Sequence, residues 1–272
     1  MKKVFLIVKH QGEKGPRVAK EVESFLKNKG IAINKGELHN DDEAIVVVGG
    51  DGTLLHVASL AFKRQIPLLG INAGGLGFLT EVHTDEMKEA LDSLIKERFK
   101  LDERMVLSVK VFNGKNKLIK EYIALNEAVI TKGALSKIIQ IHTWADGDYL
   151  TTYKGDGLII STATGSTGYN LSAGGPIVHP SLEVTILTPI CPFALSARPL
   201  ILSGNTTIKV KVQNIQEEVC LDIDGQVGLH LEDDYFIEIT RMQDKLKLVK
   251  TPHRDYFTIL REKLGWTTGI AL

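Results

Sequence analysis

Cysteine is scarce in this sequence, and no regular metal-binding pattern is present. Cys191 and Cys220 are the only cysteines among 272 residues, and no CxxC or HExxH spacing occurs among them and the eight histidines. The sequence therefore predicts neither a disulfide framework nor a structural zinc site. Two unpaired cysteines fit a reducing compartment, so we expect a cytoplasmic protein.

The sequence also lacks net charge and long apolar runs. Lysine and arginine together number 33, as do aspartate and glutamate, so the formal net charge is zero. The apolar run from Val4 to Val8 is too short for a signal-peptide core, and no segment approaches the roughly 18 apolar residues of a membrane span. We expect neither nucleic acid nor a membrane as a partner, and local groups must bind any anionic ligand.

What the chain does contain is enough apolar sequence for one large domain or two ordinary ones, since 43% of its residues are hydrophobic. Strand-like and helix-like segments alternate over residues 1–100. This alternation predicts a Rossmann-like α/β nucleotide-binding domain with a parallel sheet. The expected strands are 4–9, 43–48 and 66–72, and the expected helices are 15–30, 53–64 and 84–99.

Residues 101–250 show short alternating strands instead, with turn signals at Asn113-Gly114 and Asp146-Gly147. We expect an all-β, sandwich-like second domain there. Residues 251–272 form a C-terminal segment in which 255–266 is amphipathic, and we expect this helix to pack back on the N-terminal domain. The strand-like stretches of the second domain are 104–112, 138–153, 206–214, 218–225 and 235–250.

The stretch GGDGT, Gly49 to Thr53, lies between an expected buried strand and an expected helix. Glycines at a strand end let a ligand approach the backbone and permit positive φ angles, and the following helix N-terminus attracts phosphate. An Asp-Gly hairpin turn is the alternative, but no second strand follows. Asp51 would repel phosphate unless it helps hold Mg²⁺ or accepts a proton from an attacking hydroxyl, and both roles indicate phosphoryl transfer.

The usual nucleotide motifs are absent. No GxxxxGK[ST] occurs, and GGLGF at residues 74–78 does not satisfy GxGxxG. The sequence therefore predicts another kind of phosphate site.

Two further segments carry closely spaced polar residues. Residues 154–180 crowd serine, threonine and glycine around Tyr169, which a flexible linker would also explain. The strand-like LIIS and the apolar YNLSAGGPI argue against a linker and favour a site for ribose hydroxyls and amides. Asn126 and Glu127 lie between apolar residues, where a kink in an edge strand is the favoured interpretation from the residues alone.

Taken together, these segments resemble the NAD kinase family over nearly the whole chain. The matching motifs are GGDGT, LNE at 125–127, GDGLIISTATGSTGYNLSAGGPIVHP at 155–180 and DGQ at 224–226, in the family's order and spacing. PICPFALSARPLIL at 189–202 and the terminal KLGW at 263–266 are similar as well. The chain departs from the family pattern at Ala163, Gly168 and Phe193, and none of these changes removes a group with obvious chemistry.

The resemblance implies transfer of a phosphoryl group from ATP to the 2′-hydroxyl of the adenosine ribose of NAD, with Mg²⁺ or another divalent cation. It also implies a homodimer or homotetramer. Asp51 would be the catalytic residue, and the metal would be held through the nucleotide rather than by protein ligands alone. Asn126 and Glu127 would hold ribose hydroxyls. The other binding residues implied are Gly49, Gly50, Gly52, Thr53, His56, Phe78, Lys137, Lys154, Asp156, Thr164, Thr167, Gly168, Tyr169, Asn170, Leu171, Ser172 and Gln226.

Two other functions are compatible with parts of this pattern. A lipid kinase of the diacylglycerol or sphingosine type shares GGDGT, but it needs a membrane-docking face that this neutral chain does not show. A catalytically silent NAD sensor would keep residues 154–180 and lose Asp51, which is present. His56 is equally explained as a half-buried surface histidine.

Overall fold

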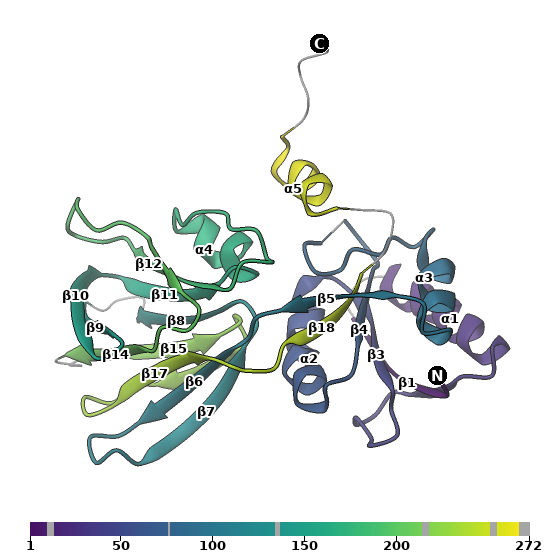
Figure 1. Cartoon of the computed structure of the whole chain (residues 1–272), viewed down its shortest axis with the longest axis horizontal. Helices are drawn as coiled ribbons and strands as arrows, with labels where there is room; N and C mark the ends of the chain where they lie inside the picture. The colour runs from purple at the N-terminus through teal and green to yellow at the C-terminus, as the bar shows by residue number, and fades with distance from the viewer. Residues whose placement is uncertain (10–13, 76, 134–136, 214–217, 251–254, 267–272) are drawn as a thin grey trace, which may run out of the picture. The chain divides into compact units, whose positions relative to one another are not determined.

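The computed structural model describes residues 1–9, 14–75, 77–133, 137–213, 218–250 and 255–266. The chain divides into two compact units, Met1–Glu103 with Leu246–Leu272 and Arg104–Lys245 (Figure 1). Within the described residues, no helix is both long and apolar enough to cross a membrane.

The first unit is built on a six-stranded sheet with the order β2-β1-β3-β4-β18-β5. The neighbours β2 and β1, β1 and β3, β3 and β4, and β4 and β18 run parallel. The predicted α/β fold with a parallel sheet is confirmed. The strands are β1 (Lys3–Val8), β2 (Ala32–Asn34), β3 (Ala44–Gly49), β4 (Leu68–Asn72), β5 (Lys100–Arg104) and β18 (Leu246–Lys250).

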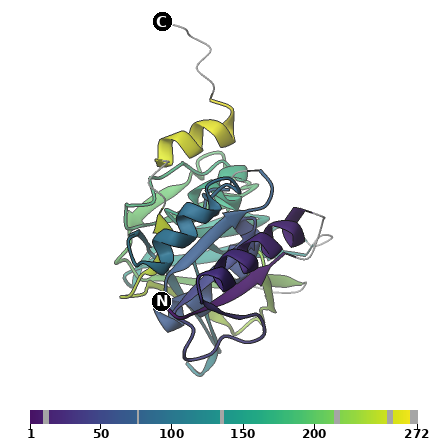
Figure 2. The same ribbon diagram turned by 90° about the vertical axis from the view of Figure 1, so that its right-hand side faces the viewer.

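Helices cover both faces of this sheet (Figures 1 and 2). Val46 of β3 and Leu69 of β4 share one core with the buried residues of α1 (Lys14–Asn28) and α3 (Met87–Ile95). On β4, Gly70 points the opposite way, because a Cβ there would lie 2.9 Å from Leu54 Cδ1 of α2 (Asp51–Arg64). The alternation of the two faces explains why these strands are buried on both sides.

The helix α3 is shorter than the sequence pattern predicts. It begins at Met87 and ends at Ile95, rather than covering 84–99. Glu97 takes a positive φ of 54°, which a continuing helix does not allow, and Arg98 N–H bonds back to Ser93 O at 2.9 Å.

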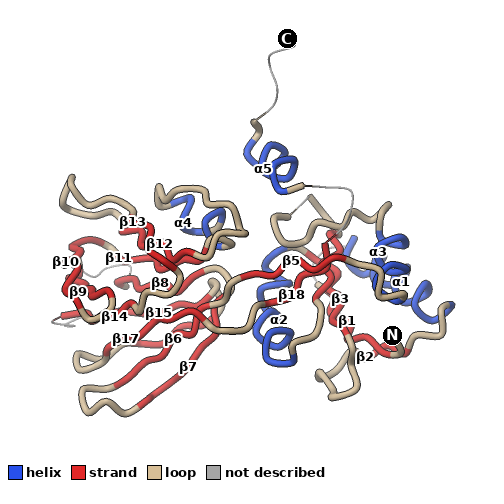
Figure 3. Tube along the Cα trace, in the orientation of Figure 1, coloured by secondary structure: helices blue, strands red, loops and turns tan. Residues whose placement is uncertain are grey.

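The second unit contains two six-stranded antiparallel sheets, with the orders β10-β9-β14-β17-β6-β7 and β13-β12-β11-β8-β15-β16 (Figure 3). Buried side chains from both sheets, such as Val109 and Ile160, form one shared core, as the sandwich prediction requires. The first sheet contains β6 (Leu107–Phe112), β7 (Leu118–Ala124), β9 (Ile139–Ala145), β10 (Asp148–Gly155), β14 (Ile208–Gln213) and β17 (Phe236–Arg241). The second contains β8 (Glu127–Lys132), β11 (Gly157–Thr162), β12 (Val184–Ile190), β13 (Leu200–Ser203), β15 (Val219–Ile223) and β16 (Val227–His230).

Three short elements complete the described structure. A 3₁₀ turn, η1 (Gly165–Thr167), and the one-turn helix α4 (Tyr169–Ser172) follow β11. The C-terminal helix α5 (Tyr256–Leu264) is capped by Asp255, whose carboxylate accepts the N–H of Thr258 at 2.8 Å. Ile259 and Leu260 of α5 are buried, whereas Phe257 is 58% exposed. That this helix packs on the first unit stays a prediction.

The strand β18 differs in its pairing from what the pattern of residues 235–250 suggests. The alternation places the whole stretch among the antiparallel strands of the second half. In the structure β17 belongs to the second unit, whereas β18 lies beside β4 in the parallel sheet. Alternation shows that a segment is a strand, but it carries no information about which strand it joins.

Candidate functional site

In the first unit, Asp51 is the first residue of α2, directly after the buried strand β3. Gly50 caps this helix without a side chain, so the helix N-terminus stays open to a ligand. A Cβ at Gly49 would lie 2.6 Å from Thr53 Oγ1, whereas Cβ atoms at Gly50 and Gly52 would meet nothing within 4 Å. Gly49 therefore allows close packing, and Gly50 and Gly52 leave the backbone accessible.

The expectation of positive φ angles in this turn is wrong. Gly50 has a φ of −106°, and neither Gly49 nor Gly52 is among the residues with positive φ. The parallel strand passes into the helix without a left-handed residue, so only close approach remains as the reason for glycine. His56, one turn further along α2, is exposed.

The Asp51 carboxylate holds the loop that follows β4. Oδ1 accepts hydrogen bonds from Leu79 N at 3.1 Å, Thr80 N at 2.9 Å and Thr80 Oγ1 at 3.0 Å. Among the described residues, Oδ2 accepts one hydrogen bond, from Phe78 N at 2.8 Å. Since a carboxylate oxygen has about two lone-pair sites, Oδ2 can accept another donor or a cation.

The sequence analysis missed two residues that support this arrangement. Asn72 is buried at the end of β4, where its Nδ2 donates to Thr80 Oγ1 at 3.0 Å and to Gly75 O at 2.7 Å. Its Oδ1 accepts Gly74 N–H at 2.6 Å. The stretch GGLGF, which does not match a dinucleotide motif, could have pointed to this loop, because the loop donates hydrogen bonds to Asp51. Phe78, a predicted binding residue, donates its backbone N–H to the Asp51 carboxylate.

In the second unit, Asn126 and Glu127 lie at the start of β8, held there by Asp224. The Asp224 carboxylate accepts the N–H groups of Leu125 at 2.9 Å, Asn126 at 2.8 Å and Glu127 at 3.0 Å. Asp224 lies in the turn between β15 and β16 with a φ of 51°. This anchor was visible in the DGQ motif, of which the sequence analysis selected only Gln226.

Within the described part of the chain, two side-chain oxygens at this point are buried without a hydrogen-bond partner, Asn126 Oδ1 and Glu127 Oε2. Gly168 adjoins both side chains, because a Cβ there would lie 3.1 Å from Glu127 Oε2 and 3.5 Å from Asn126 Nδ2. Buried polar atoms without partners are costly, and hydroxyl or N–H groups of a ligand could donate to Asn126 Oδ1 and to an ionised Glu127 carboxylate.

Glu127 is only 6% exposed, and its ionisation reflects this. Burial, followed by repulsion from Asp224, raises the pKa of the Glu127 carboxyl to about 8, against a smaller opposing effect of the Tyr169 N–H. Burial also raises the pKa of Asp224, and the hydrogen bonds that it accepts from three backbone N–H groups counteract this increase. Burial thus favours the protonated form of Glu127 in the free protein.

The segment after β11 is folded and packed, which excludes a flexible linker. Asn170 is fully buried, with Nδ2 donating to Ser166 O at 3.0 Å and Pro176 O at 3.1 Å and Oδ1 accepting Thr188 Oγ1 at 2.6 Å. Its polar atoms are thus used to hold the loop. Thr164 is buried, Thr167 and Leu171 are half-buried, and Tyr169 and Ser172 are exposed.

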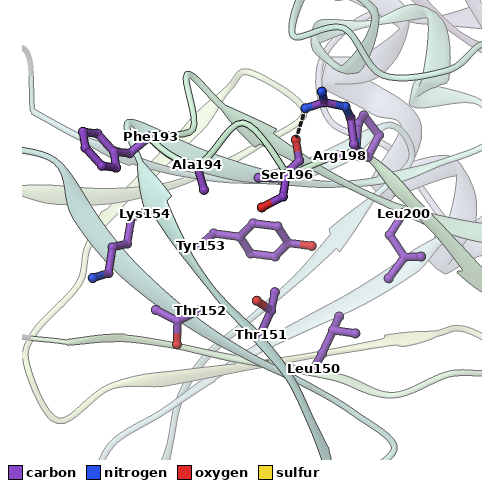
Figure 4. A pocket seen from close by; sticks show the side chains of 12 residues that line it. Leu150, Thr151, Thr152, Tyr153, Lys154, Phe193, Ala194, Ser196, Arg198 and Leu200 are labelled. Atoms are coloured by element: carbon purple, nitrogen blue, oxygen red, sulfur yellow. Dashed lines mark hydrogen bonds between the residues drawn. The ribbon is translucent and has the colours of Figure 1, made fainter.

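Of the other predicted residues in the second unit, Lys154 lies on a strand, and Asp156, Lys137 and Gln226 lie in connections between strands. Lys154 on β10 lines a cavity of about 510 Å³ together with Tyr153, Phe193 and Arg198 (Figure 4). Asp156 lies 3.6 Å from Lys132 Nζ. Lys137 and Gln226 are exposed, the latter in the turn beside Asp224.

Comparison with known proteins matches both halves of the chain to one family. The family model described as ATP-NAD kinase N-terminal domain matches residues 35–99, and the one described as ATP-NAD kinase C-terminal domain matches residues 125–251. The chain is 41% identical to the NAD kinase of Geotalea daltonii, covering 98% of this chain and 99% of that protein. It is 48% identical to the NAD kinase of Geobacter sulfurreducens, covering 81% and 78%.

Solved structures give the same result. A yeast NADH kinase complexed with NADH matches with a TM-score of 0.90 and 25% identity, over 100% of this chain and 90% of that chain. An NAD kinase from Archaeoglobus fulgidus in complex with ATP matches with a TM-score of 0.79 and 27% identity, over 96% and 99%.

Proposed function

This chain belongs to the NAD kinase family, and we propose that it uses Asp51, Asn126 and Glu127 to transfer the γ-phosphate of ATP to the 2′-hydroxyl of the adenosine ribose of NAD. It is a phosphotransferase that binds ATP and NAD and forms NADP and ADP. The identity to curated NAD kinases over 98% of the chain is the observation that carries this conclusion. The alternative of a lipid kinase finds no support among these relatives.

Asp51 orients the attacking hydroxyl and accepts its proton. Phosphoryl transfer asks mainly for positioning and charge neutralisation, so a fixed carboxylate beside the nucleophile fits the reaction. Phe78, Leu79 and Thr80 fix its direction through four hydrogen bonds, and Oδ2 keeps room for the hydroxyl.

Asn126 and Glu127 bind ribose hydroxyls of NAD. Their partnerless buried oxygens support this role, because hydroxyl donors would satisfy them. Ribose hydroxyls that donate to Glu127 would favour its ionised form, since hydrogen bonds to a charged acceptor are about twice as strong as neutral ones. Thr164, Thr167, Gly168, Tyr169, Leu171 and Ser172 complete the nucleotide site, with Asn170 and Asp224 holding the backbone in place.

The proposed reaction also requires a divalent cation, preferably Mg²⁺, bound together with ATP. Asp51 lies at a helix N-terminus that favours phosphate, so the cation would be held mainly through the nucleotide, and the remaining acceptor site of Oδ2 is left to the attacking hydroxyl. When bound with the nucleotide, such a cation neutralises charge on the phosphates.

We also propose a cytoplasmic enzyme that acts as at least a dimer. Cys191 and Cys220 are both free thiols, which supports a reducing compartment. Phe193 is 78% and Leu195 88% exposed in the segment that lines the cavity beside Lys154, and large exposed apolar side chains of this kind are typical of subunit contacts.

Parallel incubations test the function. Purified protein with ATP and Mg²⁺ is given NAD, NADH or diacylglycerol in separate reactions, and the phosphorylated products are separated chromatographically. We expect NADP in the NAD reaction and no phosphatidic acid. Formation of phosphatidic acid without NADP would show a lipid kinase instead.

A further inference from the structure

The hairpin of β15 and β16 brings together three side chains that the proposed function does not use. Cys220 lies directly opposite His230 in the strand register, and Glu218 immediately precedes β15. Strand pairing thus fixes Cys220 and His230 as cross-strand neighbours. Glu218 and His230 are exposed and Cys220 is half-buried, so all three can be reached from solvent.

The separations between their donor atoms fit one metal ion. Cys220 Sγ lies 3.6 Å from His230 Nδ1 and 3.9 Å from Glu218 Oε1, and His230 Nδ1 lies 3.4 Å from Glu218 Oε1. Tetrahedral zinc, with bonds of about 2.3 Å to sulfur and 2.0–2.2 Å to nitrogen or oxygen, places its ligands roughly 3.3–3.7 Å apart. Only the exposed Glu218 carboxylate has to move, by a few tenths of an ångström on that estimate.

The chemical types of these three side chains indicate which metal ion they would bind. A thiolate, an imidazole and a carboxylate together suit a borderline-soft divalent cation, whereas Mg²⁺ and Ca²⁺ require oxygen ligands.

We propose that Glu218, Cys220 and His230 form a Zn²⁺ site that joins the two strands of this hairpin, with a water molecule as the fourth ligand. The site is separate from the cation that accompanies ATP. Its ligands come from β15, from β16 and from Glu218, which precedes β15. The bound ion therefore stabilises the hairpin whose turn carries Asp224.

Cobalt substitution tests the proposal directly. Metal-stripped, nucleotide-free full-length protein is titrated with Co²⁺, and the near-ultraviolet band of a thiolate-to-cobalt transition is recorded. We expect the band to saturate at one equivalent and to disappear when Zn²⁺ displaces the cobalt. Zn²⁺ should also raise the melting temperature of the same protein. A protein without this band at saturating Co²⁺ would overturn the proposal.

Variants identify the ligands. Cys220→Ser should abolish the band, and His230→Gln, at an exposed position, should weaken Zn²⁺ binding by more than the 10- to 100-fold that loss of an outer-shell partner typically costs. Cys191→Ser, which changes the other free thiol, is the matched control and should keep both the band and the affinity. A band that survives Cys220→Ser, or Zn²⁺ affinity unchanged in His230→Gln, would contradict the assignment.

Discussion

The two oxygens of the Asp51 carboxylate have unequal surroundings, and this inequality is central to the proposed chemistry. Oδ1 accepts three hydrogen bonds and Oδ2 one. The first oxygen therefore anchors the side chain, and in the proposed mechanism the second accepts the proton of the attacking hydroxyl. An anion at a helix N-terminus is also stabilised by the helix dipole, so Asp51 contributes to the fold in addition to its proposed catalytic role.

Thr80 tests the anchoring. Thr80→Val keeps the shape of the side chain but removes a hydroxyl that donates to Asp51 and accepts from Asn72. We expect a loss of about 1–3 kcal/mol in unfolding free energy, because buried partners are left unsatisfied. The turnover number should fall while the KM for NAD changes little. Thr80→Ser restores the hydroxyl and should recover most of both losses. Equal turnover in the two variants would exclude an orienting role.

Glu127 predicts an unusual dependence of stability on pH. The pKa of Glu127 in the folded protein, about 8, lies above the ordinary value of 4.5. Its contribution to the free energy of unfolding is therefore fully present below about pH 4.5 and is lost as the pH rises through about 8. Glu127→Gln stays neutral and should melt several degrees above the wild type at about pH 9, but not at about pH 5, since each pKa unit is worth about 1.4 kcal/mol. Calorimetry across this range measures the difference, and a difference independent of pH would contradict the buried, protonated state.

We expect the ionisation of Glu127 to affect NAD binding as well. If ribose hydroxyls donate to ionised Glu127, the KM for NAD of the wild type should fall as pH rises through about 8, because binding no longer has to remove a proton. In Glu127→Gln the KM should be higher and this fall should vanish. A KM that rises over the same range would show that NAD binds the protonated form.

At the scale of elements, the loop after β4 acts through Asp51. Gly77→Ala places a methyl group where the Asp51 carboxylate and Thr80 Oγ1 lie, so it should displace both and cost most of the activity together with stability. Gly75→Ala, in the same loop, meets nothing within 4 Å and should be close to neutral. Activity and melting temperature of the pair measure the effect. A Gly77→Ala enzyme with wild-type turnover would mean that the loop does not position Asp51.

The sequence predicted the elements of this fold better than their partners. The alternation of strands and helices correctly gave the parallel sheet, because periodicity reports burial directly. It could not assign β18 to that sheet, since pairing depends on side chains far apart in the chain. The same limit hid the Glu218, Cys220 and His230 cluster: no regular spacing connects these residues, and only the register of β15 and β16 brings them together.

The candidate site shows a similar division. GGDGT was selected as a candidate site from its residues, because a glycine-flanked carboxylate between a strand and a helix stands out in a sequence. Asn126 and Glu127 were selected only through the family resemblance, since their residues alone favoured a kink in an edge strand. Thr80 and Asn72 were missed, since their function is to bind Asp51 and each other rather than a ligand. Asn170 looked like a binding residue, but its amide is used inside the fold. Polarity in a sequence does not show whether a partner is internal.

At the scale of the whole molecule, the proposed self-association places Phe193 in a contact between copies of the chain. Phe193→Glu should dissociate the oligomer and lower activity at low protein concentration, because it buries a charge in an apolar contact. Leu118→Glu is the control: Leu118 is 45% exposed on β7, at the opposite edge of the same sheet from β10. Light scattering across a dilution series gives the mass, and a wild type that is monomeric and fully active throughout would refute association.

The most direct measurement for the account as a whole is steady-state NADP formation by Asp51→Asn. The asparagine carbonyl can take the place of Oδ1 toward Leu79 and Thr80, whereas its NH₂ group replaces Oδ2 and loses the hydrogen bond from Phe78 N. The three remaining hydrogen bonds should keep the loop in place, and the KM for NAD should be kept or slightly lowered. The group that accepts the proton is gone, and the turnover number should fall by about two to four orders of magnitude, as expected for a lost general base. An Asp51→Asn enzyme that phosphorylates NAD at close to the wild-type rate would show that Asp51 only shapes the turn, and the mechanism proposed for this chain would be wrong.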